Sequence, residues 1–114
     1  GASVCIAARN TAQANELASE LSCEIATEQL DGIDTVINCT PVGMIGSDDP
    51  EGDPLLQLAP SLKLTDAIRV VDLVYAPPKT PLVQRAEEVG CKTARGEALF
   101  AAQASLQQKF WSPT

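Results

Sequence analysis

The chain has 114 residues, the length of one domain or less, and 45% of them are hydrophobic, which predicts a globular protein rather than a disordered one. The net charge of −7, without any basic cluster, argues against a nucleic-acid-binding protein. No apolar run approaches the ~20 residues of a membrane-spanning helix, and the first residues show no signal-peptide pattern. We therefore expect a cytoplasmic protein.

The cysteines and the acidic residues predict no metal centre. Cys5, Cys23, Cys39 and Cys91 match no metal-binding spacing, and the chain has no histidine. We expect reduced thiols that behave as small apolar side chains, as is usual in cytosolic proteins. The acidic run at residues 48–53 is typical of a solvated loop.

The amino-terminal half begins with a strand, a helix and a strand. Residues 3–8 are a continuously apolar run of the kind that is buried on both faces of a parallel sheet. A helix is predicted over residues 11–21, with Asn10 or Thr11 as its N-cap. Its apolar residues recur at helical spacing, at Ala14, Leu17, Ala18 and Leu21. A weak strand is expected at residues 23–26 and a strong one at 34–38.

The carboxyl-terminal half alternates in the same way. The predicted elements are short helical turns within residues 55–64, a strand at 70–74, a helix at 82–89, a strand at 91–94 and a helix at 97–111. Gly90 follows the helix at residues 82–89, where glycine is the residue that most often ends a helix. Strands that alternate with helices indicate an α/β protein with a mostly parallel sheet flanked by helices.

The loop after the strand at residues 34–38 is the most informative stretch. Asn38 and Cys39 lead into Thr40-Pro41-Val42-Gly43-Met44. Pro41 fixes φ and lacks an N–H donor, and Gly43 allows a positive φ or a close approach. Loops at the carboxyl ends of parallel strands are where open α/β sheets bind ligands. An ordinary β-turn is the alternative interpretation.

A second unit of this kind follows the strand at residues 70–74. It runs through Tyr75 and two prolines, and Thr80-Pro81-Leu82 opens the next helix. Tyr75 is the only tyrosine of the chain. It either faces a ligand or lies at the edge of the core with its hydroxyl group in water.

The last helix carries a polar residue on an apolar stripe. Leu99, Gln103, Leu106 and Phe110 share one helical face. A buried Gln103 needs partners, because an unsatisfied amide costs ~1–3 kcal/mol, and a bound ligand or a structural hydrogen bond would supply them equally well. Gly96, just before this stripe, favours a close backbone approach or a helix-entry turn.

Taken in order, these strings resemble the C-terminal, cofactor-binding half of the shikimate dehydrogenase family. Asn38 and the five residues from Thr40 to Met44 match one family motif residue for residue. The other matches are Asp72, Val74, Tyr75, Pro77, Thr80-Pro81-Leu82, Gly96, Leu99-Phe100 and Gln103, with Ala76 where asparagine is usual. The resemblance covers nearly the whole chain.

The resemblance implies a Rossmann-like NADP-binding fold and a set of site residues. It places the cofactor at Arg9, Asn10, Thr40, Val42, Met44, Leu73, Val74 and Gly96, and the substrate at Tyr75 and Gln103. Arg9 matches the arginine that binds the 2′-phosphate of NADP, where an acidic residue would favour NAD. Ala8 and Gln13 replace an asparagine and a lysine of the family, so NAD stays possible. A solvated Arg9 at a strand end is the alternative.

The glycine-rich turn that opens a Rossmann fold is missing from the sequence. In the strand order 3-2-1-4-5-6, the strand before that turn is central. We therefore expect residues 1–114 to be one incomplete Rossmann-type domain without its first strand, a fragment that is poorly stable when isolated. The strands at residues 3–8 and 34–38, which take positions 2 and 4 of this order, would border an open slot of roughly 9–10 Å or pair with each other.

The resemblance also implies an activity, the reversible reduction of 3-dehydroshikimate to shikimate with NADPH in aromatic amino-acid biosynthesis. The family takes its catalytic lysine and aspartate from an N-terminal substrate domain, and no residue here matches them. We therefore assign no catalytic residue to this chain, expect that domain as its covalent partner, and expect no activity from the isolated chain. A non-catalytic nucleotide-sensing or structural module of the same fold is the alternative, and quinate or another substrate stays open.

Overall fold

The computed structural model describes residues 3–26, 30–74 and 76–111. Its first unit consists of β1 (Cys5–Ile6), α1 (Thr11–Leu21) and β2 (Glu24–Ile25). The two strands pair in parallel, with Cys5 opposite Glu24. Asn10 is the N-cap of α1, because its side-chain oxygen accepts a hydrogen bond from the Gln13 N–H at 3.0 Å. The helix therefore begins and ends as the sequence predicts.

The larger apolar side chains of this first unit are exposed, and the prediction that its first strand is buried on both faces is wrong. Val4 is 53% exposed, and Leu17 and Leu21 are 45% and 59% exposed. The buried residues of α1 are Ala14 and Ala18. Two strands of two residues each offer too narrow a surface to cover larger side chains. Only the small residues that face the strands are therefore enclosed.

The second unit contains a three-stranded parallel sheet. Its elements are β3 (Thr35–Asn38), α2 (Pro54–Leu58), β4 (Arg69–Asp72), α3 (Pro81–Val89), β5 (Lys92–Arg95) and α4 (Gly96–Trp111). The strand order is β3-β4-β5, and the register sets Asp72 between Asn38 and Arg95. β4 ends at Asp72 rather than at Val74, so Leu73 and Val74 lie in the loop that follows the strand.

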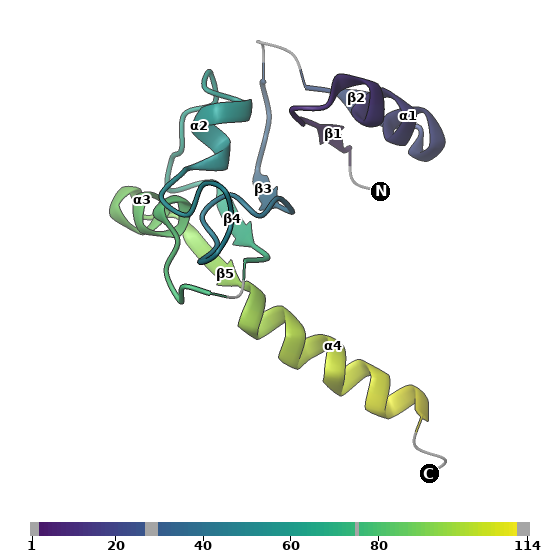
Figure 1. Ribbon diagram of the computed structural model, residues 1–114, viewed down its shortest axis with the longest axis vertical. Coiled ribbons are helices and arrows are strands. Elements are labelled where there is room, and N and C mark those ends of the chain that lie inside the picture. Colours follow the sequence, from purple (N-terminus) through teal and green to yellow (C-terminus); the bar gives the residue numbers. More distant parts are fainter. Residues whose placement is uncertain (1–2, 27–29, 75, 112–114) are drawn as a thin grey trace.

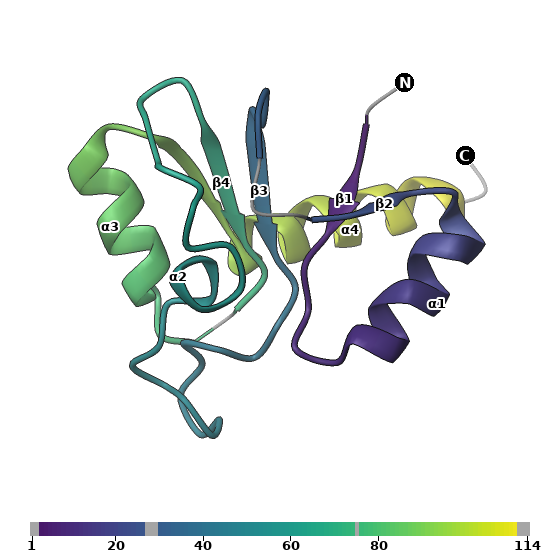
Figure 2. The ribbon, with the colours of Figure 1, turned by 90° about the horizontal axis from the view of Figure 1, so that it is seen from above.

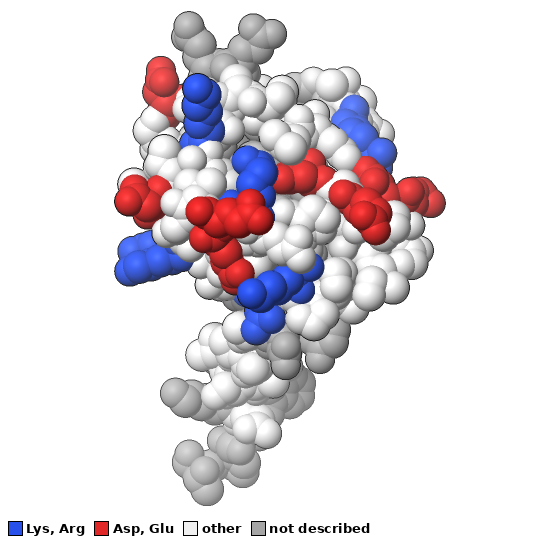
Figure 3. Space-filling model, turned by 90° about the vertical axis from the view of Figure 1, so that its left-hand side faces the viewer, with Lys and Arg blue, Asp and Glu red and all other residues white. Residues whose placement is uncertain are grey.

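The hydrophobic core belongs to this second unit. Val70 and Leu82 are fully buried, and they share one cluster with Leu55 and Ala86. Burying a side chain such as Leu82 stabilises the fold by ~1.5–3 kcal/mol. On the side of the molecule that carries α3, acidic and basic side chains are interspersed (Figure 3). That face therefore shows no single basic patch.

The two sheets follow the expected Rossmann order. The orders β2-β1 and β3-β4-β5 correspond to strands 3-2 and 4-5-6, with the place of strand 1 between β1 and β3. Figure 2 shows the small sheet beside β3, with β1 and β3 running in the same direction. The prediction of a partial, parallel Rossmann-like fold is confirmed. No backbone pairing joins β1 to β3 within the described residues, so the alternative in which these strands close up is not formed.

Helix α4 extends away from the rest of the molecule (Figure 1). It contacts the body through β5. Gln103 and Leu106 are both exposed, so the apolar stripe does not bury the glutamine. The physical reason is that α4 continues past the end of the sheet instead of packing along it.

Candidate functional site

A buried polar network joins the carboxyl ends of β3 and β4. Asn38, Asp72 and Thr80 are 4%, 1% and 2% exposed. The Asn38 Nδ2 donates to Asp72 Oδ1 at 3.0 Å, and the Thr80 hydroxyl donates to Asp72 Oδ2 at 2.7 Å. The Val74 N–H donates to Asp72 Oδ1, also at 3.0 Å. One carboxylate thus holds two strand ends and the start of α3.

The loop after β3 is folded on the other side of Asn38. The Asn38 Oδ1 accepts from the Thr40 N–H at 3.0 Å and from the Thr40 hydroxyl at 2.7 Å. The Thr40 oxygen accepts in turn from the Val42 N–H at 3.2 Å, and the Val42 carbonyl lies 3.4 Å from Asn38 Nδ2. Val42 is buried and its backbone groups are bonded within the loop, whereas Cys39 and Pro41 are exposed. Met44 is half-buried.

Gly43 holds this loop against the start of α3. Its φ is +91°, and its N–H donates to the Asp49 carbonyl at 2.8 Å. A Cβ atom at this position would lie 3.4 Å from the Gly52 carbonyl oxygen and 3.4 Å from Thr80 Cβ. Both the backbone conformation and the available space therefore favour glycine here.

Gly96 begins α4, as its interpretation as a helix-entry turn requires, and it packs against the loop after β4, whereas its approach to a cofactor stays a prediction. A Cβ atom on Gly96 would lie 2.5 Å from the Leu73 carbonyl oxygen. The Leu73 N–H donates to the Asn38 carbonyl at 3.1 Å, and Leu73 itself is 41% exposed. Val74 is buried, and Tyr75 lies outside the described residues. Gly96 thus lets α4 begin directly against the loop after β4.

Arg9 and Asn10 lie at the end of β1, on the other sheet. Arg9 is exposed. The ion pairs in the described part of the chain are Lys79–Glu87 and Arg85–Asp53, so Arg9 has no acidic partner there. The side-chain oxygen of Asn10 accepts a hydrogen bond as the N-cap of α1. Asn10 was one of the two N-cap residues that the sequence predicted, the other being Thr11.

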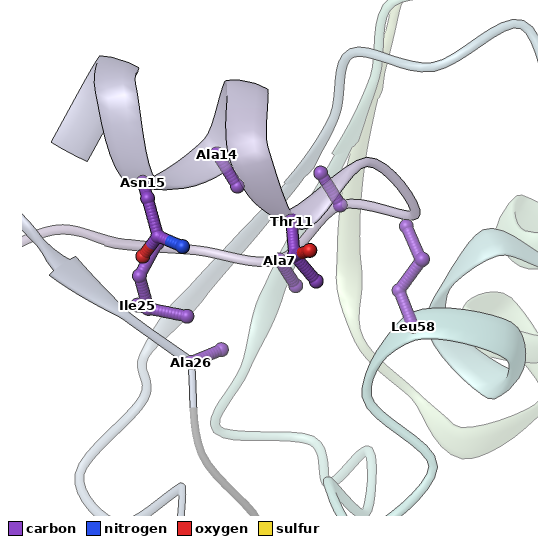
Figure 4. A pocket seen from close by; sticks show the side chains of 8 residues that line it. Ala7, Thr11, Ala14, Asn15, Ile25, Ala26 and Leu58 are labelled. Atoms are coloured by element: carbon purple, nitrogen blue, oxygen red, sulfur yellow. The ribbon is translucent and has the colours of Figure 1, made fainter.

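A hollow of about 180 Å³ adjoins this strand end (Figure 4). α1, β2 and α2 enclose it with small and apolar side chains and with two polar ones, Thr11 and Asn15. Its lining residues are Ala7, Ala8, Thr11, Ala14, Asn15, Ile25, Ala26 and Leu58. Typical ligand pockets measure ~300–1,000 Å³, so this hollow holds part of a larger ligand at most.

The sequence-predicted residues fall into three groups. The register of β3, β4 and β5 brings together Thr40, Val42, Met44, Leu73, Val74 and Gly96 at one edge of the larger sheet. Arg9 and Asn10 lie at the end of the neighbouring sheet. Gln103 stands apart, because seven residues of α4 separate it from Gly96 by ~10 Å along the helix axis. The structure does not bring Gln103 to the other residues.

Sequence reasoning missed the residue at the centre of the site. Asp72 and Thr80 were noted only as motif positions, although an acidic residue inside the apolar run at residues 70–74 was a signal of a buried, bonded carboxylate. Arg95 was also missed. Its Nη1 donates to the Pro78 carbonyl at 3.1 Å and ties the end of β5 to the loop before α3.

Within residues 3–26, 30–74 and 76–111, no three His, Cys, Asp or Glu side chains converge as a metal site would require. Among the same residues, no helix is both long and apolar enough to span a membrane.

Curated relatives match three quarters or more of the chain. A shikimate dehydrogenase (NADP(+)) of Methanocella arvoryzae is 35% identical over 98% of this chain and 42% of its own length. That of Alkaliphilus metalliredigens is 42% identical over 75% of this chain and 28% of its own length. That of Methanocaldococcus jannaschii is 33% identical over 89% of this chain and 37% of its own length. The chain thus spans less than half the length of these relatives.

Solved structures give the same result. A shikimate dehydrogenase in complex with NADP+ superposes with a TM-score of 0.67 and 28% identity over 98% of this chain and 42% of that one. A shikimate 5-dehydrogenase-like protein, at 23% identity and a TM-score of 0.73 over 96% of this chain and 40% of that one, shares the fold. No protein-family model matches the chain. Over nearly all of its length, the chain is therefore similar to the C-terminal part of the shikimate dehydrogenases.

Proposed function

We propose that this chain forms the NADP(H)-binding side of a shikimate dehydrogenase, which reduces 3-dehydroshikimate reversibly to shikimate. The observation that carries the proposal is the pair of loops at residues 38–44 and 73–74, which a buried network fixes at the carboxyl edge of the sheet. Open α/β sheets bind nucleotides at this edge. The names of the relatives and the NADP+ complex of one solved relative support the choice of ligand.

Arg9 is the residue that would bind the 2′-phosphate of NADP. Arg9 is exposed, it follows β1, and it belongs to neither ion pair of the described residues. The hollow beside it offers apolar surface together with Thr11 and Asn15, which suits part of an adenosine group. The residues present therefore fit the cofactor at this end. NAD lacks the 2′-phosphate, so with NAD as the ligand the charge of Arg9 would lose this partner.

The loop after β4 would face the nicotinamide end. In this loop Leu73 is partly exposed and Val74 is buried. Gly96 lets the start of α4 pack against the Leu73 backbone. When bound, the nicotinamide ring supplies the hydride, and the protein's part is to orient the ring and to exclude water. Tyr75 and Gln103 stay proposed substrate contacts, although Gln103 is exposed on α4 and apart from this loop.

The proton that accompanies the hydride needs a separate donor near the substrate oxygen. Among the lysines whose side chains the structure describes, Lys79 forms an ion pair with Glu87 at 2.9 Å, Lys63 is exposed, and Lys92 is exposed at the start of β5, the strand end opposite the two loops. We propose that a substrate domain, covalently joined to this chain, supplies the donor. The 114-residue chain then shows no turnover when isolated.

Titration with NADPH tests the proposal through the nicotinamide fluorescence. R9Q should weaken NADPH binding by about tenfold, as expected for one charge-assisted phosphate contact, and should leave NADH binding unchanged. R69Q is the matched control, because Arg69 is an exposed arginine at the start of β4, on the other sheet. Equal effects of R9Q and R69Q, or no NADPH binding at all, would contradict the proposal.

A polypeptide that also includes a substrate domain separates the dehydrogenase from the nucleotide-sensing module, when both NADPH binding and turnover are measured. Turnover of 3-dehydroshikimate by that polypeptide supports the dehydrogenase. Binding of NADPH without turnover would instead support a nucleotide-sensing module of the same fold.

A further inference from the structure

The Asp72 carboxylate links three segments that are separate in the sequence. Its two oxygens accept from the Asn38 side chain at the end of β3, from the Val74 N–H in the loop after β4, and from the Thr80 hydroxyl at the N-cap of α3. All three donors are neutral, and neither ion pair of the described residues includes Asp72. The hydrogen bonds to this carboxylate, rather than a countercharge, therefore hold the segments together.

The hydrogen-bond network extends beyond the direct partners of Asp72. Asn38 uses its other atom, Oδ1, to hold Thr40, and Thr40 holds the Val42 N–H. A chain of hydrogen bonds therefore runs from Asp72 to the middle of the loop at residues 38–44. Because Asp72 is 1% exposed, its donors are shielded from bulk water, and removing the carboxylate takes away the acceptor that they share.

We propose that Asp72 is a positioning residue that fixes the loops at residues 38–44 and 73–74 as one rigid unit for NADP(H). This inference rests on the proposed function only for the identity of the ligand. An apolar side chain at position 72 would fill the space, but it would leave three buried donors without an acceptor. Each loop would then move independently of the other.

Amide hydrogen exchange tests the rigid unit without any ligand. D72A should accelerate exchange at the Val42 and Val74 N–H groups by at least about tenfold. The Gly90 N–H, which is bonded to the Ala86 carbonyl at the far end of α3, is the internal reference and should change less. D72N keeps one oxygen for Asn38 and Val74, so it should restore most of the protection. Equal acceleration at all three amides would overturn the proposal, because it would indicate a loss of global stability only.

NADPH affinity tests the positioning role, at a temperature where circular dichroism shows each variant folded. T80V, which removes the hydroxyl donor to Asp72, should weaken binding by about fivefold, and T80S should restore it. Added to D72A, T80V should change the affinity by less than about twofold, because the shared acceptor is already gone. Effects that multiply fully would overturn the proposal. If the unmodified chain binds no NADPH, the proposed function fails, and the exchange experiment still decides the role of Asp72.

Discussion

The two units of this chain contain similar apolar patterns but bury them very differently. In the β1–α1–β2 unit, the buried helix residues are two alanines, and Leu17 and Leu21 face solvent. In the β3–β5 unit, Val70 and Leu82 are completely enclosed between the sheet and two helices. An apolar stripe therefore predicts which face of a helix points inward. Whether large side chains on that face are covered depends on the width of the sheet beneath it.

The largest expected effect comes from removing a core side chain in the second unit. L82A should lower the free energy of unfolding by ~2–5 kcal/mol, because Leu82 is fully enclosed and the cavity cannot collapse completely. L17A is the matched variant in the first unit and should change the same quantity by less than ~1 kcal/mol. Urea denaturation followed by circular dichroism measures both. Similar losses for the two variants would show that both units share one core.

A smaller effect is expected at the contact between α4 and the loop after β4. G96A places a methyl group against the Leu73 backbone, which cannot move aside without shifting the loop, so we expect a loss of ~1–3 kcal/mol. G52A is the control, because a Cβ atom there meets the flexible ends of the Asp49 and Gln57 side chains. Thermal unfolding should separate the two variants. An unchanged melting temperature for G96A would mean that α4 does not depend on this contact.

The smallest expected effect distinguishes a half-buried ion pair from an exposed one. Asp53 caps α2 through the Leu55 N–H at 2.9 Å and accepts from Arg85 Nε at 2.7 Å. D53A should cost ~1–2 kcal/mol, with D53N retaining most of the cap. K79A removes an exposed pair and should cost less than ~0.5 kcal/mol. Chemical denaturation of the three variants tests this order, which a larger loss for K79A would contradict.

The sequence predicted the elements well where the local signals agreed. Asn10 caps α1, and Gly90 ends α3 with a φ of +98°. Both residue types determine helix ends through the backbone next to them, so their effect does not depend on distant segments. The last strands and helices were placed to within one or two residues for the same reason. The exposure of Val4, Leu17 and Gln103 could not be predicted, because it depends on what lies across from them in space.

The candidate site was predicted in part. The motif at residues 38–44 indicated a loop at the carboxyl edge of the sheet, and the structure places it there, because its position after a strand determines that placement. The role of Asp72 was missed, since a carboxylate that binds Asn38, Val74 and Thr80 is recognisable only when three distant segments are brought together. For Gly96 the sequence indicated a close backbone approach but not its partner, the Leu73 carbonyl.

Within the part of the chain that the structure describes, Asp72 has no charged partner, and this affects how the two ends of the proposed site respond to ionic strength. Exposed charges such as Arg9 are screened over a Debye length of ~8 Å at physiological salt, so concentrated salt weakens any phosphate contact that Arg9 makes. The hydrogen bonds around Asp72 are out of reach of mobile ions. Buffers of high salt concentration should therefore weaken the proposed contact of Arg9 with a dinucleotide, while the loops at residues 38–44 and 73–74 keep their shape.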